Sequence, residues 1–161
     1  MIQLLENLDD RYNPKLYIIA SKDRISEEKV LTFEKTRATG TYTIATIPRS
    51  REVHQSYVSS IITTLYSFYY AVKIVWKTKP DLVLVNGPGT CIPVVIAAAV
   101  LDMIRLRDTT IIYEESICRV ERLSLSGALL YYSGLADDII VQWPNLKDKY
   151  PRATLVHDIE E

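Results

Sequence analysis

The sequence predicts an α/β fold in which a parallel sheet is flanked by helices, the Rossmann-like, doubly wound arrangement. Short apolar runs without polar alternation recur along the chain, and such runs are typical of strands buried on both faces of a parallel sheet. Segments long enough for crossover helices separate these runs. Several of the runs end in glycine-containing or acidic turns, where strands of this class give way to helices.

Each expected strand is a short run rich in aliphatic and β-branched residues. In chain order the strands are expected at 16–20, 42–46, 81–85, 109–113 and 138–142. Helices are expected at 1–8, 55–77, 91–103 and 117–132. A further helix is expected between the first two strands, with Ser26 as its N-cap. A fold of this class normally opens with a strand whose following turn carries the ligand, so the opening strand and its turn are expected to be missing here.

Length and composition predict one domain that covers residues 1–161. A hydrophobic content of 48% and a charged content of 24% exclude intrinsic disorder. The formal net charge of −1 excludes a nucleic-acid binder driven by bulk charge and leaves room only for a local basic patch. Two cysteines and two histidines make a structural metal site unexpected, and we expect no cofactor.

The most informative turn follows the expected strand at 81–85 and precedes a helix. Its glycines would let the backbone approach a ligand, and the helix N-terminus would offer N–H groups to a diphosphate. The alternative is a turn that needs Gly and Pro only to pass from strand to helix. The residues concerned are Asn86, Gly87, Pro88, Gly89 and Thr90.

Polar residues also follow the next expected strand, at the same edge of the sheet. Glu114 and Glu115 are two adjacent carboxylates that would bind sugar hydroxyls, or one of them would act as a general base. The alternative is a solvated loop in which Ser116 caps the next helix. Arg119 and Arg122 would share a helix face and meet phosphates, or they would pair with nearby carboxylates.

Two further segments have open interpretations. Arg49 and Arg51 follow a strand and would form a phosphate clamp or a solvated charged loop. The segment 55–77 is rich in Tyr, Ser and Thr, and it would form part of the core or touch a membrane surface.

Several strings in combination resemble one family. It is the acceptor-binding, membrane-anchoring subunit of the eukaryotic UDP-N-acetylglucosamine transferase of dolichol-linked oligosaccharide synthesis. The chain is also similar, more distantly, to the N-terminal half of the bacterial lipid-II-forming glycosyltransferase. The strings are DLVLVNGPGT at 81–90, ESICR at 115–119, LSLSG at 123–127, IVQWP at 140–144 and the loop RSREV at 49–53.

The resemblance implies a GT-B fold split between two proteins, of which this chain is the N-terminal half. It implies binding of the acceptor GlcNAc-diphosphate-dolichol at the cytosolic face of the endoplasmic reticulum membrane. A separate catalytic subunit would bind UDP-GlcNAc, and GlcNAc would be joined β1,4 with inversion. The turn at 86–90 would hold the acceptor diphosphate or sugar, Glu115 and Ser116 would contact its saccharide, and Arg49, Arg51 and Arg119 would supply positive charge.

Members of the family begin with a membrane helix, a strand and a Ser-Gly-Gly-His turn before the segment that matches Met1, so the chain is expected to be a fragment, an isoform or a truncated gene model. A scaffold that recruits a partner to a membrane without binding substrate is the alternative function. An unrelated nucleotide-binding Rossmann domain is the third, and the absence of a first glycine turn with an acidic ribose-binding residue counts against it.

Overall fold

The structure is a computed structural model that describes residues 5, 8, 11–21, 23–37, 40–48, 57–87, 89–104 and 108–156. For residues 57–61 it describes the backbone but not the side chains. The chain divides into two compact units, Met1–Arg49 and Ser50–Glu161, and each is described by itself. That residues 1–161 act as one domain stays a prediction.

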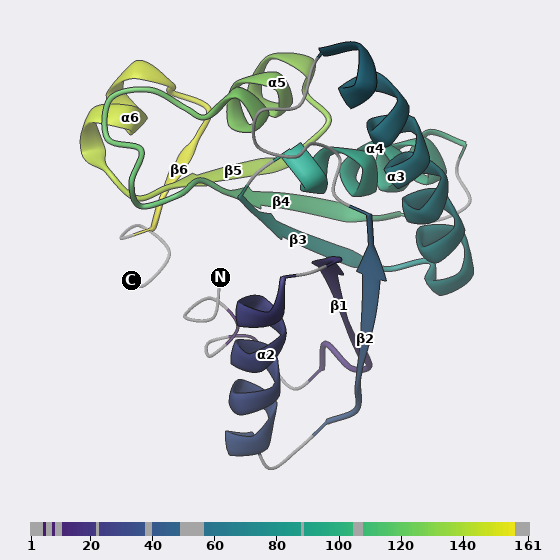
Figure 1. Cartoon of the computed structure of the whole chain (residues 1–161). Helices are drawn as coiled ribbons and strands as arrows, with labels where there is room; N and C mark the ends of the chain where they lie inside the picture. The colour runs from purple at the N-terminus through teal and green to yellow at the C-terminus, as the bar shows by residue number, and fades with distance from the viewer. Residues whose placement is uncertain are drawn as a thin grey trace. The chain divides into compact units, whose positions relative to one another are not determined.

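In the described part of the first unit, two parallel strands are connected by helix α2 (Figure 1). Strands β1 (Lys15–Ala20) and β2 (Tyr42–Ile47) pair in register from Lys15↔Tyr42 to Ala20↔Ile47. Helix α2 (Arg24–Thr36) connects them, and its buried Glu34 accepts a hydrogen bond from Lys15 Nζ at 3.2 Å.

The expected N-cap of α2 was wrong by three residues. The helix begins at Arg24 because the Asp23 carboxylate accepts hydrogen bonds from the backbone N–H of Ser26 at 3.1 Å and from its hydroxyl at 2.9 Å. Asp is as good an N-cap as Ser, and the cap side chain normally bonds the third helical N–H, which is that of Ser26.

The second unit contains a four-stranded, all-parallel sheet in the order β3-β4-β5-β6. Figure 1 shows α3, α4 and α5 on one side of this sheet. The elements are α3 (Tyr57–Thr78), β3 (Leu82–Asn86), the 3₁₀ turn η1 (Gly89–Cys91), α4 (Ile92–Met103), β4 (Thr110–Glu114), α5 (Leu125–Ser133), β5 (Asp138–Val141), α6 (Pro144–Lys149) and β6 (Thr154–Leu155). The predicted class, α/β with parallel sheets flanked by helices, is confirmed.

Helix α4 forms the centre of the core of the second unit. Most of its residues are buried, including Val95 and the run Ala97–Ala99, as expected for a helix that is apolar on all sides. It packs against α3 and lies next to β3 and β4, where Ile111 and Tyr113 are buried. Full burial of a Val or Ile side chain contributes about 1.5–3 kcal/mol to folding.

The expected helix at 117–132 was wrong in its first half. The chain runs through turns and bends from 115 to 124, and α5 begins only at Leu125, where Ser124 accepts a hydrogen bond from Gly127 N as the N-cap. Ile117, Val120 and Leu123 have the spacing of a helix face, but Ile117 and Val120 are exposed. Arg119 and Arg122 therefore share no helix face, and Ser116 is not the cap of this helix.

Candidate functional site

One carboxylate joins the carboxyl ends of three neighbouring strands in the second unit. Glu114, the last residue of β4, accepts a hydrogen bond from Asn86 Nδ2 at 2.6 Å and another from Gln142 Nε2 at 3.0 Å. Asn86 is the last residue of β3 and Gln142 directly follows β5. Glu114 is only 7% exposed, so these bonds lie in a partly dry environment, where they are stronger than in water. The three strand ends thus form one polar edge.

The side-chain oxygens of the two amides take no part in this network. No donor from the described part of the chain reaches Asn86 Oδ1 or Gln142 Oε1, and both residues are half-buried. An amide oxygen can accept a hydrogen bond from a hydroxyl group. The edge therefore offers two hydrogen-bond acceptors on side chains that Glu114 holds in place.

A second network connects the glycine turn to the start of α5. The Tyr113 hydroxyl donates to Gly87 O at 3.3 Å and lies 3.0 Å from Ser124 Oγ, which caps α5. Burial raises the pKa of Tyr113 to about 12, the Glu115 charge adds to the rise, and the Ser124 hydrogen bond opposes it. The hydroxyl is therefore protonated at neutral pH and serves as a structural donor.

Glu115 lies inside the protein, below the loop that follows β4. It is 1% exposed, and its two oxygens accept hydrogen bonds from Ser116 N at 2.9 Å and Ser124 N at 2.7 Å. A Cβ atom at position 127 would overlap Glu115 Oε2 and lie 3.2 Å from a Tyr113 ring carbon, so only glycine fits there. These contacts make Glu115 a positioning residue for the loop; the direct ligand contact expected of it stays a prediction.

The turn after β3 provides an opening beside this edge. Gly87 has φ +101°, a conformation that favours glycine, whereas a Cβ on Gly89 would meet nothing within 4 Å. The turn leads through η1 into α4, whose first N–H groups can bind an anion. Burial raises the pKa of the Cys91 thiol to about 11, so this group is protonated at neutral pH.

The structure brings most of the predicted site residues to this edge. Asn86 ends β3 and is followed by Gly87, Gly89 and Thr90, and the loop with Glu115 and Ser116 follows the neighbouring strand β4. Arg119 is exposed in the same loop, and its charge partly offsets the rise that burial causes in the pKa of Tyr113. Arg49, Arg51 and Pro88 lie outside the described residues.

Sequence reasoning selected Glu114 together with Glu115, but it missed the contacts that hold the edge together. The hydrogen bonds of Glu114 with Asn86 and Gln142 were not expected, and Gln142 and Tyr113 were given no role at the site. A signal was present, because Asn86, Glu114 and Gln142 each stand at or directly after the end of an expected strand. Residues at equivalent ends of adjacent parallel strands become neighbours once the register is fixed.

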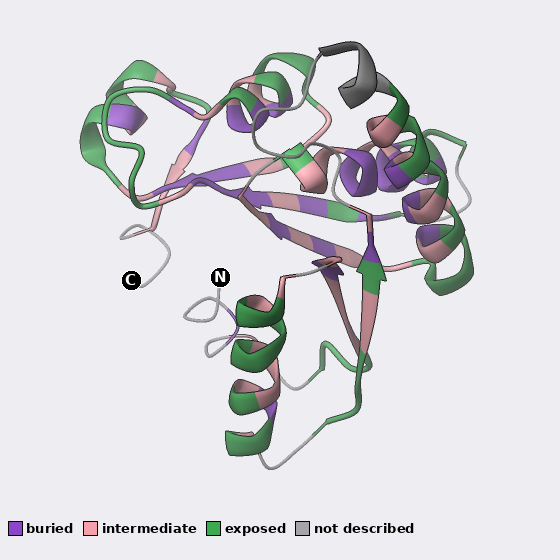
Figure 2. Ribbon diagram, in the orientation of Figure 1, coloured by how far each residue is buried: buried purple, intermediate pink, exposed green. Residues whose placement is uncertain are grey.

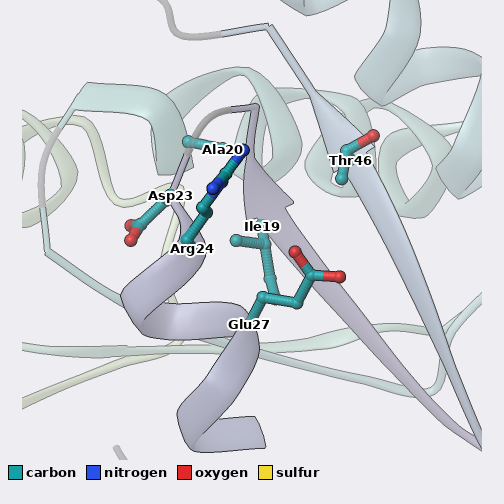
Figure 3. A pocket seen from close by; sticks show the side chains of 6 residues that line it. All are labelled: Ile19, Ala20, Asp23, Arg24, Glu27 and Thr46. Carbon is teal, nitrogen blue, oxygen red and sulfur yellow. The ribbon is translucent and has the colours of Figure 1, made fainter. Parts of the chain in front are cut away.

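The first unit has a pocket of its own, of about 370 Å³, at the carboxyl ends of β1 and β2 (Figure 3). Figure 3 shows Arg24 and Glu27 reaching from α2 toward the strands, with Thr46 on β2. One cation and two carboxylates line the pocket, and the Asp23 carboxylate already caps α2, so the pocket is poorly suited to a diphosphate. Its residues are Ile19, Ala20, Asp23, Arg24, Glu27 and Thr46.

In the part of the chain that the structure describes, no cluster of three His, Cys, Asp or Glu side chains could hold a metal ion. None of the helices in that part combines the length and the apolar character needed to cross a bilayer.

Comparison with known proteins gives a consistent result. Residues 1–158 match the model of a family described as "Oligosaccharide biosynthesis protein Alg14 like". Rat and human proteins named UDP-N-acetylglucosamine transferase subunit ALG14 are each 46% identical over 160 residues, which covers 95% of this chain and 73% of the relative. A protein of the same name from Yarrowia lipolytica is 46% identical over 156 residues and covered to 71%. No solved structure matches the chain.

Proposed function

The chain belongs to the Alg14 family of oligosaccharide biosynthesis proteins, and from this premise we propose that it is the acceptor-binding subunit of a UDP-N-acetylglucosamine transferase. In this proposal a separate catalytic subunit binds UDP-GlcNAc. The present chain recruits that subunit to the cytosolic face of the endoplasmic reticulum membrane and binds GlcNAc-diphosphate-dolichol, the acceptor of a second GlcNAc.

The observation that carries the acceptor-binding role is the hydrogen-bonded set of Asn86, Glu114 and Gln142 across three strand ends. In open parallel sheets, ligands bind beyond the carboxyl ends of the strands. The amide oxygens of Asn86 and Gln142 would supply acceptors for the hydroxyls of the acceptor sugar. Since Glu114 holds both amides, little ordering is needed when the sugar binds.

The diphosphate would lie beside the sugar, at the turn that leads into α4. The open space at Gly89 lets a phosphate approach the backbone, and the α4 N-terminus supplies N–H donors. Arg119, Arg49 and Arg51 would add positive charge, and Thr90 and Ser116 would add hydroxyl donors. Glu115 and Gly127 would hold the loop that carries Ser116 and Arg119.

A recruiting scaffold without a substrate site is the second candidate, and one observation favours it. The two carboxylates at the end of β4 already accept hydrogen bonds from the protein. Glu114 accepts from two side-chain amides, and Glu115 accepts from two backbone N–H groups. Neither is placed as a general base within the described residues. In the scaffold model, all the chemistry would belong to the catalytic subunit.

An activity assay distinguishes the acceptor-binding subunit from the recruiting scaffold. The chain is mixed with the donor-binding subunit in detergent, and formation of the chitobiosyl lipid is measured. Asn86→Ala should raise the KM for the lipid acceptor about tenfold and leave the KM for UDP-GlcNAc unchanged, because a lost sugar hydrogen bond is worth about 1.5 kcal/mol. Asn145→Ala, on the exposed surface of α6, is the matched control. Unchanged acceptor KM in Asn86→Ala, with partner binding intact, would establish the scaffold instead.

A further inference from the structure

The outward side of α3 is apolar and aromatic. Five of its large side chains are between 53% and 67% exposed: Ile62, Leu65, Tyr66, Tyr69 and Trp76. Their spacing of three or four residues places them on one side of the helix, opposite the buried Ser67, Ala71 and Val75. Figure 2 shows exposed residues of α3 on the side turned away from the sheet. We call these five residues, with Lys73 and Lys77, the α3 face.

The α3 face is not needed to build the second unit. The helix already packs against α4 through its other side, where Ala71 and Val75 are buried. The exposed side of α2 shows what an ordinary solvated helix offers to water, since it carries Arg24, Glu28 and Lys35. Contiguous exposed apolar rows are typical of surfaces that contact another molecule.

The charges on the α3 face select the kind of contact. Lys73 and Lys77 are exposed on this side, whereas the 22 residues of Tyr57–Thr78 contain no Asp or Glu. Lys is depleted in the centre of protein interfaces. Tyr and Trp are enriched at the boundary between lipid headgroups and acyl chains, and lysines reach from such a helix toward anionic headgroups.

We propose that the α3 face lies on the surface of a bilayer that contains anionic lipids, with the helix in the plane of the interface. This contact is additional to any anchor, and it depends on the proposed function only for the identity of the membrane. Only the short turn 79–81 separates α3 from β3, so Trp76 lies near the amino end of that strand, away from Asn86. The fluorescence of Trp76 therefore reports on the α3 face from a position away from the polar edge.

Sedimentation of the full chain with vesicles tests the proposal. The wild-type chain should bind vesicles of phosphatidylcholine with phosphatidylserine more tightly than vesicles of phosphatidylcholine alone, and salt should weaken the binding. The double variant Lys73→Glu/Lys77→Glu should lose about tenfold or more in partitioning. The matched control is Lys29→Glu/Lys35→Glu, which makes the same charge change on α2 and should bind as the wild type does.

A second pair of variants tests the apolar part of the face. Ile62→Ser/Leu65→Ser/Tyr69→Ser should lose about tenfold or more in partitioning. Leu125→Ser/Leu129→Ser/Tyr132→Ser removes three side chains that are exposed on α5, a helix without charges, and should bind normally. In a Trp143→Phe background, the fluorescence of Trp76 should shift to the blue when vesicles are added, and circular dichroism melts should show that each variant is folded.

The proposal would be overturned if the wild-type chain did not bind vesicles. It would also be overturned if the α3 and α5 variants lost vesicle binding equally, or if the emission of Trp76 did not change. Loss of the catalytic subunit from the α3 variants with vesicle binding intact would also overturn it, since the face would then contact protein. In detergent, the α3 variants should retain transferase activity. If even the wild-type pair lacks activity while vesicle binding behaves as described, the proposed function fails and the membrane contact stands.

Discussion

The two units present polar groups at the carboxyl ends of their strands, but they use these groups differently. In the first unit, Arg24 and Glu27 are exposed at the rim of a pocket, and Asp23 caps α2. In the second unit, Asn86 and Gln142 converge on the buried Glu114. A rigid set of polar groups binds a ligand with a smaller entropic cost than mobile side chains do. The comparison therefore favours the second unit as the ligand site.

The largest effect should come from filling the space at Gly127. A side chain there overlaps Glu115 Oε2, so Gly127→Val should lower the free energy of unfolding by about 3 kcal/mol or more. Urea denaturation gives the value. Gly89→Ala is the control, because its Cβ points into open space and should change stability by less than about 0.5 kcal/mol. A similar loss in both variants would show that the loop is not held through Glu115.

Removal of the shared carboxylate should have the next largest effect. Glu114→Ala leaves Asn86 Nδ2 and Gln142 Nε2 without their acceptor, at a cost of about 2 kcal/mol in unfolding free energy. Glu27→Ala, at the rim of the pocket in the first unit, should cost about 0.5 kcal/mol or less. If both variants lost the same unfolding free energy, the strand ends of the second unit would be no more firmly held than those of the first.

Alkaline pH should reveal the buried Tyr113 hydroxyl. Its pKa is raised to about 12 because burial disfavours the phenolate, so between pH 10 and 12 the unfolded chain loses this proton while the folded chain keeps it. The wild type should therefore lose stability with rising pH in this window, by at most about 2 kcal/mol more than Tyr113→Phe. Unfolding curves of the two proteins at pH 9 and about pH 11.5 measure the difference; parallel pH profiles would contradict the burial of a titrating hydroxyl.

The sequence predicted the class of fold and the edge, but not the contacts at the edge. The five strands expected at 16–20, 42–46, 81–85, 109–113 and 138–142 each lie within one residue of the observed ends, since apolar runs report burial directly. The start of α5 was missed because Ile117 and Val120 imitate a helix face, and local pattern does not reveal that Glu115 binds Ser124 N nine residues away. The role of Glu114 depends on strand register, which no single strand encodes.

The acceptor is expected to bind at the edge formed by β3, β4 and β5. The most direct test is the acceptor KM of the reconstituted pair with Gly89→Val, compared with the double variant Arg24→Ala/Glu27→Gln in the pocket of the first unit. Gly89→Val should raise the KM for the lipid-diphosphate sugar about tenfold or more without loss of stability, and the double variant should leave it unchanged. A raised acceptor KM in the double variant, with an unchanged KM in Gly89→Val, would place the acceptor in the pocket of the first unit and contradict binding at the edge.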